Sequence, residues 1–249
     1  MANRQRAEAR RKAAAKAARE SNGSKMWLWV TLGVVAVAAI IGAIVVVSGG
    51  DDETDADGTE VTNPSSNFPD SQPVTVTGDA LDVYQGPYPS QQEDPSFGVA
   101  APILAGKNFQ GDAVTIDGTA NGPTMVVFLA HWCPHCNAEV PRLLDWKNSG
   151  GVPQDLDVVG VATAVSSQKP FYPPAEWFET KGWSWPVLVD EKANDDGGAG
   201  KAALAFGASA WPYFVILGSD GTVLARGSGE LSVDEIQSIV DAAMAADTA

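Results

Sequence analysis

The chain has only two cysteines, and they stand close together in the run Cys133-Pro134-His135-Cys136. Disulfide exchange needs a thiolate, and a free cysteine at neutral pH is mostly in the thiol form. A disulfide across so short a loop restricts little of the unfolded chain, so it would add little stability. The spacing therefore indicates redox chemistry in preference to a structural cross-link.

The elements on either side of the cysteines are the ones needed to position a reactive thiol. Residues 124–130 (TMVVFLA) form a continuous apolar run, which is typical of a central strand buried on both faces. A helix is expected to follow, through about Trp146. Cys133 would stand at its N-terminus, where unpaired N–H groups and the helix dipole favour an anion, and Pro134 suits the first turn. Cys136 lies one turn further on and is expected to be the more buried partner.

The rest of the globular part, from about residue 74, alternates strand and helix patterns. Strands are expected at Val74–Thr77, Leu81–Val83, Leu156–Thr163, Val187–Asp190, Tyr213–Leu217 and Thr222–Arg226, a hairpin within Phe97–Gly118, and helices at Pro174–Lys181, Lys201–Phe206 and after Ser232. Ser232 and Glu235 have the spacing of a capping box. This order predicts an α/β fold with a mixed sheet.

A stretch between the second buried strand and the strand at Val187 is rich in aromatic residues. They are Phe171, Tyr172, Trp177, Phe178, Trp183 and Trp185. Packing into a core beneath an added helix is the preferred interpretation. A surface that binds client proteins is the alternative.

Two segments resemble a known family. The run MVVFLAHWCPHCNAEVP (125–141) resembles the active-site region of thioredoxin-like proteins, above all the membrane-tethered TlpA/ResA-type group with its pattern W-C-x-x-C-x-x-E-x-P. Residues 211–215 (WPYFV) resemble the segment that holds the cis-proline of that family. The resemblance covers roughly Phe97 to Ala246. It implies a thioredoxin-like fold and a thiol:disulfide oxidoreductase.

The resemblance also implies roles for individual residues. Cys133 would exchange with the partner protein, Cys136 would resolve the mixed disulfide, and Glu139 would assist proton movement near the thiols. Pro212 would be cis. The expected substrate-binding residues are Trp132, which packs beside the site, and Trp211 and Pro212, which would present a surface to an extended segment. No bound cofactor and no metal are expected.

Three departures from the family pattern bear on the direction of electron flow and on the site. The flanks resemble the typically reducing TlpA/ResA type, but the dipeptide Pro134-His135 resembles strongly oxidising DsbA-type proteins. An imidazole beside a thiolate stabilises the reduced form, so His135 favours a disulfide donor. Trp211 stands where a smaller residue is common. Val127 stands where cytoplasmic thioredoxins keep a buried acid, which leaves Glu139 as the expected internal proton carrier.

Two other functions stay open beside the disulfide donor. One is a reductase of apocytochrome or other protein disulfides. The other, less favoured, is a copper-handling thioredoxin-fold module, since His131, Cys133, His135 and Cys136 offer four metal ligands within six residues. A helix from Pro134 onward would make neighbouring ligands diverge, which disfavours the metal site.

The charge of the chain is divided unevenly along its length. Its net charge is −15, yet residues 1–25 carry eight of the 16 Lys/Arg residues. Residues 26–47 are uncharged, and a helix of that length would reach about 33 Å, enough to cross a bilayer. Residues 48–73 are acidic and contain Gly, Ser and Pro, so they are expected to be a flexible linker to the domain at 74–249.

This organisation predicts a single-pass cell-membrane protein. The basic segment should stay in the cytoplasm, so the catalytic domain would be extracytoplasmic. Its partners would be protein thiols or disulfides outside the cytoplasm and a membrane redox partner, with no nucleic acid. A cleavable signal peptide with its site at Val46-Val47-Ser48 is the alternative to a retained anchor.

Overall fold

The computed structural model describes residues 68–88, 90–194 and 196–248. The basic segment at 1–25, the predicted span at 26–47 and residues 48–67 of the predicted linker lie outside the described residues. Within the described part, no helix is both long enough and apolar enough to cross a bilayer.

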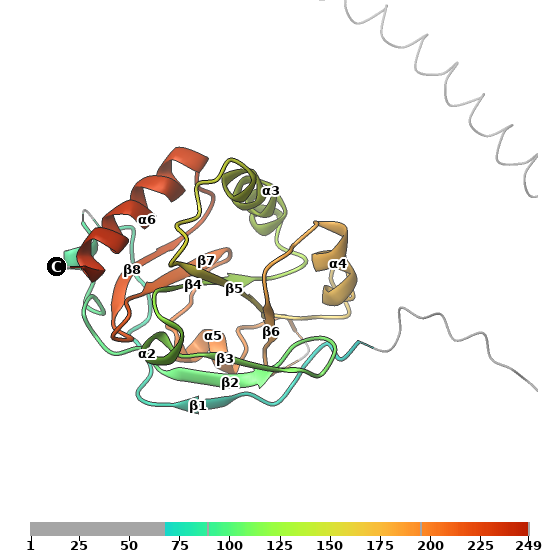
Figure 1. Cartoon of the computed structure of the whole chain (residues 1–249). Coiled ribbons are helices and arrows are strands. Elements are labelled where there is room, and N and C mark those ends of the chain that lie inside the picture. Colours follow the sequence, from blue (N-terminus) through green and yellow to red (C-terminus); the bar gives the residue numbers. More distant parts are fainter. Residues whose placement is uncertain (1–67, 89, 195, 249) are drawn as a thin grey trace, which may run out of the picture. The chain divides into compact units, whose positions relative to one another are not determined.

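The described strands form one mixed, eight-stranded sheet (Figure 1). They are β1 (Thr75–Thr77), β2 (Ile103–Lys107), β3 (Ala113–Ile116), β4 (Thr124–Leu129), β5 (Asp157–Ala162), β6 (Val187–Val189), β7 (Tyr213–Leu217) and β8 (Val223–Ser228). Their order is β1-β2-β6-β5-β4-β7-β8, with β3 paired to β2. At the centre, β4 pairs in parallel with β5 and antiparallel with β7.

Helices cover both faces of this sheet. They are α2 (Gly118–Asn121), α3 (Pro134–Asn148), α4 (Pro174–Thr180), α5 (Lys201–Ala205) and α6 (Val233–Asp247), with a short 3-10 helix, η2 (Gln91–Glu93). In Figure 1, α3, α4 and α6 lie on one side of the sheet and α5 on the other. The α/β class with a mixed sheet is thus confirmed.

Strand β4 brings the chain to the cysteines and is buried along its whole length. Because strand side chains alternate, Met125, Val127 and Leu129 pack into the core that α3, α4 and α6 share. Val126 and Phe128 pack on the opposite face, in the core with α5. The prediction of a strand buried on both faces is confirmed, and the strand ends where the active-site loop begins.

Most predicted elements are present, but the strand expected at Leu81–Val83 is wrong. This segment has no strand pairing, and its backbone binds the end of α5: the Leu81 N–H donates to the Ala205 carbonyl at 2.9 Å, and the Tyr84 N–H donates to that of Gly207 at 2.8 Å. The apolar side chain of Leu81 is buried in the core that contains Ala202, Ala203 and Ala205 of this helix. The hairpin expected within 97–118 is confirmed as β2 and β3.

The aromatic stretch is divided between the core and the surface. Trp177 and Phe178 of α4 are each 4% exposed and belong to the main core, which confirms the core interpretation for these two. Phe171 and Tyr172, in the loop before α4, are 59% and 42% exposed. Trp183 and Trp185, the remaining two, are half-buried against the core.

Contacts with the domain begin before the predicted boundary at residue 74. The Asp70 carboxylate lies 2.7 Å from the Lys192 ammonium and accepts a 2.9 Å hydrogen bond from the Tyr172 hydroxyl. The Ser71 hydroxyl accepts from the Lys192 N–H at 2.9 Å. These polar partners hold the end of the predicted linker on the domain surface.

A buried ion pair connects β8 to the segment before β2. Arg226 is 1% exposed and Asp94 is 4% exposed, and the guanidinium donates to both carboxylate oxygens, from Nε at 2.8 Å and from Nη2. Arg226 Nη1 also donates to the Asp82 carbonyl at 2.6 Å. Because a buried guanidinium needs such partners, these contacts hold Asp82 and Asp94 against β8.

Candidate active site

Cys133 is the N-cap residue of α3, directly after the turn that leaves β4. Its carbonyl accepts from the Asn137 N–H at 3.0 Å, which is the first hydrogen bond of the helix. Cys133 is 5% exposed and Cys136 is fully buried. Both thiols are free, so the structure describes the reduced form.

The surroundings of the two thiols separate their pKa values. A hydrogen bond from the Cys136 thiol lowers the pKa of Cys133 to about 6, against the effect of burial, and the N–H groups of Cys136 and His135 and the His135 charge act in the same direction. Burial raises the pKa of Cys136 well above its ordinary value, and the hydrogen bond with Cys133 adds to this. The reduced pair at neutral pH is therefore one thiolate, at Cys133, and one buried thiol.

The Trp211–Pro212 peptide lies against the reactive sulfur. The bond is cis, as the resemblance implies, and Cys133 Sγ lies 3.4 Å from the Trp211 carbonyl oxygen. Trp132 does not contact the reactive sulfur through its polar group: its indole N–H donates to the Ala164 carbonyl at 2.7 Å. Trp132 thus packs beside the site, held by the loop after β5.

The His131 ring binds backbone groups of the segment after β5. It is 1% exposed, its Nδ1 lies 2.8 Å from the Pro170 carbonyl, and its Nε2 accepts from the Ser166 N–H at 3.4 Å. A carbonyl only accepts, so Nδ1 carries the proton, and burial lowers the pKa of the ring. Both ring nitrogens are engaged, and across residues 68–248, apart from 89 and 195, no group of three or more His, Cys, Asp or Glu side chains is placed to hold a metal ion.

Glu139 is a buried carboxylate on α3, 3% exposed. It accepts from the Leu231 N–H at 2.9 Å and from Arg142 at 3.2 Å. Burial raises the pKa of Glu139, and these two donors oppose that shift. Its charge contributes to the raised pKa of Cys136, so Glu139 is within electrostatic reach of the buried thiol. Val127 lies in the same core as Cys136 and supplies no acid there.

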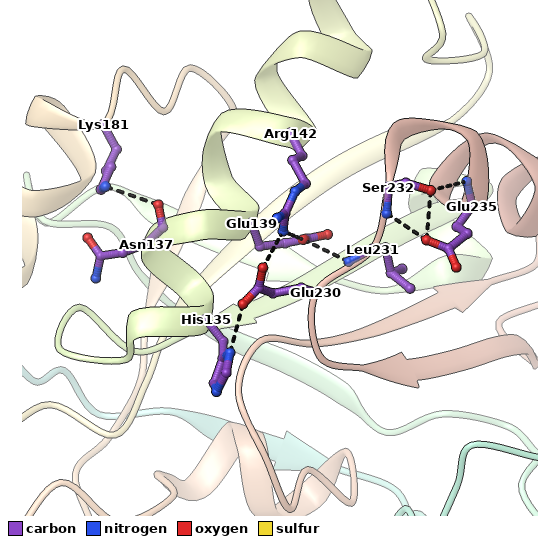
Figure 2. Close-up of polar contacts among 9 residues, drawn as sticks. All are labelled: His135, Asn137, Glu139, Arg142, Lys181, Glu230, Leu231, Ser232 and Glu235. Atoms are coloured by element: carbon purple, nitrogen blue, oxygen red, sulfur yellow. Dashed lines mark hydrogen bonds and ion pairs between the residues drawn. The ribbon is translucent and has the colours of Figure 1, made fainter. Parts of the chain in front are cut away.

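Two charged residues that sequence reasoning missed connect His135 to Glu139, as Figure 2 shows. His135 Nδ1 lies 2.8 Å from one oxygen of Glu230, and the other oxygen of Glu230 lies 2.7 Å from Arg142. Arg142 stands three residues after Glu139 on one helix, a spacing that could have revealed the pair. Glu230 is 95 positions from His135, and no local pattern points to it.

Asn137, also missed, fixes the active-site turn. Its amide donates to the carbonyls of His131 at 3.1 Å and Cys133 at 3.0 Å. The Trp177 indole N–H donates to its side-chain oxygen at 3.0 Å, and Lys181 donates to its backbone carbonyl at 3.2 Å. Residues from α4 thus help to hold the turn that carries Cys133.

A comparison with known families decides the assignment, since residues 97–226, more than half of the chain, match the AhpC/TSA family. The chain belongs to the AhpC/TSA family. No curated protein matches it significantly in sequence. Membership in the AhpC/TSA family, together with the two thiols at the start of α3, supports a thioredoxin-like fold and a thiol–disulfide oxidoreductase.

Several solved structures are similar to this AhpC/TSA-family chain. StoA from Bacillus subtilis is 15% identical with a TM-score of 0.44, over 57% of this chain and 98% of that one. A thiol:disulfide interchange protein from Chlorobium tepidum is 23% identical with a TM-score of 0.45, over 58% and 95%. A secreted Mycobacterium tuberculosis disulfide oxidoreductase is 23% identical with a TM-score of 0.41, over 55% and 94%. Similarity at this level carries no argument about substrate or direction.

Proposed function

We propose that this chain is an extracytoplasmic thiol–disulfide oxidoreductase that exchanges a Cys133–Cys136 disulfide with protein thiols and acts mainly as a disulfide donor. The observation that carries the proposal is the divided thiol pair. The pKa of Cys133 is lowered to about 6, while burial raises that of Cys136. A thiolate is the species that forms and leaves disulfides, and a buried thiol one turn away can close the ring.

The exchange proceeds in two displacements. A client thiolate attacks Cys133 Sγ of the disulfide, the bond to Cys136 breaks, and the Cys136 sulfur takes up a proton from solvent. Glu139, within electrostatic reach of that sulfur, is the residue proposed to assist this proton movement. A second client thiolate then attacks the client sulfur of the mixed disulfide, and Cys133 leaves as a thiolate. Two electrons pass from the client dithiol to the protein. The Trp211 carbonyl beside Cys133 offers an acceptor for the backbone N–H of an extended client segment.

His135 favours the oxidising direction. Its charge stabilises the Cys133 thiolate, and stabilising the reduced form makes the pair a stronger oxidant. One observation favours the alternative, a reductase. A Cys133 pKa of about 6 is closer to that of thioredoxin, about 7, than to that of DsbA, about 3.5.

The reduction potential of the full-length chain in graded thiol buffers separates the two directions, with tryptophan fluorescence as the signal. We expect a value between those of thioredoxin, about −270 mV, and DsbA, about −120 mV, and on the oxidising side of about −200 mV. A value at or below about −270 mV would support the reductase. Absence of any reversible two-electron transition would contradict both.

The proposed location follows from the N-terminal sequence. Residues 26–47 would anchor the chain in the cell membrane, with residues 1–25 in the cytoplasm and a membrane redox partner to restore the disulfide. A maleimide that cannot cross membranes, added to intact cells after mild reduction, should label Cys133 as completely as it does in lysed cells. Labelling only after lysis would place the domain in the cytoplasm.

A further inference from the structure

Building on the proposed exchange reaction, we propose that Glu230 is a positioning residue that couples the environments of the two cysteines. One of its carboxylate oxygens holds His135, whose charge acts on Cys133. The other holds Arg142, which pairs with Glu139 on the side of Cys136.

The contacts close into a ring (Figure 2). Glu230 binds Arg142 at 2.7 Å, Arg142 binds Glu139 Oε2 at 3.2 Å, and the same oxygen accepts from the N–H of Leu231, the residue next to Glu230, at 2.9 Å. His135 joins this ring from outside, through its 2.8 Å contact with Glu230. The orientation of each side chain in the ring therefore depends on the others.

The loop that carries Glu230 is also fixed against the substrate-facing side of the site. The Gly229 N–H donates to the Pro212 carbonyl at 2.9 Å. Gly229 has a φ of 97°, a conformation that glycine adopts without the penalty of a side chain. The loop 229–231 thus contacts the cis-proline segment, the first turn of α3 and the buried carboxylate.

An isolated ion pair on the surface contributes little, because solvent screens it and two flexible side chains must be ordered. Glu230 differs because two cations share it. One of them, Arg142, is in turn shared with Glu139, whose side chain is only 5% exposed. A network of several charges with a buried member is the case in which such contacts have measurable effects.

The charges around His135 give the coupling its sign. Cys133 and Glu230 are the titratable groups that act on His135, and both raise its pKa, Glu230 the more strongly. His135 in turn is among the main causes of the low pKa of Cys133, and Glu230 is not one of them. Arg142 acts on Glu230 and lowers its pKa, and Arg142 and Glu230 both act on Glu139. Removing the Glu230 charge should therefore lower the pKa of His135 and raise that of Cys133.

The first test uses full-length Glu230→Gln in detergent and follows the histidine ring protons by NMR at increasing pH. The chain has only two histidines, so both can be assigned. In the oxidised protein, where no thiolate exists, His135 should titrate above its ordinary value of 6.5 in the wild type and near or below it in the variant. Asp234→Asn removes an equal charge four positions away, from an exposed residue, and should leave this titration unchanged.

The second test measures the rate of Cys133 alkylation against pH in the reduced protein. At pH 6, Glu230→Gln should react about two- to five-fold more slowly than the wild type, the range expected from a partly exposed ion pair. In a His135→Ala background the same substitution should have no further effect. Two results would overturn the coupling. One is a His135 titration that Glu230→Gln leaves unchanged. The other is a loss of alkylation rate in the His135→Ala background equal to that in the wild-type background.

These outcomes are separate from failure of the proposed function. If Cys133 were alkylated in the wild type only near the ordinary thiol pKa of about 8.5, the exchange mechanism would be in error. The His135 titration in the oxidised protein would still show whether Glu230 holds the imidazole.

Discussion

Replacement of Cys133 by serine should abolish disulfide exchange. The hydroxyl cannot form a disulfide, and the remaining thiol, Cys136, is fully buried with a raised pKa, so it is neither accessible nor ionised at neutral pH. The rate at which the full-length chain oxidises a two-cysteine client peptide, with a thiol oxidant present, should fall to that of the uncatalysed reaction. Retention of a substantial part of the wild-type rate would disprove attack at Cys133.

Cys136→Ser is the matched control for this experiment, since it makes the same chemical change three residues away. Its Cys133 thiol should still react with a client peptide whose single cysteine is held in a mixed disulfide with a small thiol. Neither Cys136 nor a second client thiol is then present to release the adduct. The variant should therefore accumulate client adducts that disappear on reduction, visible on non-reducing gels and by mass spectrometry. Equal behaviour of the two serine variants would contradict the division of roles between the cysteines.

The second large effect concerns stability. Asp94→Ala should destabilise the domain by about 3–5 kcal/mol, because it leaves the buried guanidinium of Arg226 without its ionic partner. Asp94 accepts from Arg226 Nε at 2.8 Å, from Arg226 Nη2 and from the Ser96 N–H at 2.9 Å, so three buried donors lose their acceptor. Urea unfolding followed by tryptophan fluorescence should show the loss as a lower midpoint with an unchanged slope.

Asp79→Ala provides the comparison, since Asp79 is exposed and belongs to the same N-terminal part of the domain. Its effect should stay within about 0.5 kcal/mol, as for most surface substitutions. If Asp94→Ala cost no more than Asp79→Ala, the ion pair would have no net effect on stability. Asp94 and Arg226 would then be held in place by the packing around them.

Local sequence signals predicted the parts of the structure that depend on neighbouring residues. The apolar run at 124–130 is β4, and α3 begins directly after Cys133. The capping box of Ser232 and Glu235 is present at the start of α6. In each case the residues that form the feature lie within one strand or one helical turn, so a short window contains the physics that decides it.

Features that depend on distant contacts could not be predicted in this way. The apolar pattern at Leu81–Val83 resembles that of a strand, but the burial of Leu81 comes from α5, more than 100 residues later in the chain. Trp132 is held by a carbonyl 32 positions away, and His135 by a carboxylate 95 positions away. Such partners are specified by the register of the sheet and the path of the loops, which no local window contains.

The hydrogen bonds that Asn137 makes in the active-site turn bear on which positions of this site can vary during evolution. Asn137 is tied to the carbonyls of His131 and Cys133 and to Trp177, whereas Pro134 and His135 between the two cysteines are exposed. Because these two side chains are exposed, substitutions there remove little buried surface, yet the positions lie beside the thiolate. We therefore expect single substitutions at Pro134 or His135 to change the reduction potential while the fold is kept. Substitutions at Asn137 or Trp177 should instead disturb the turn itself.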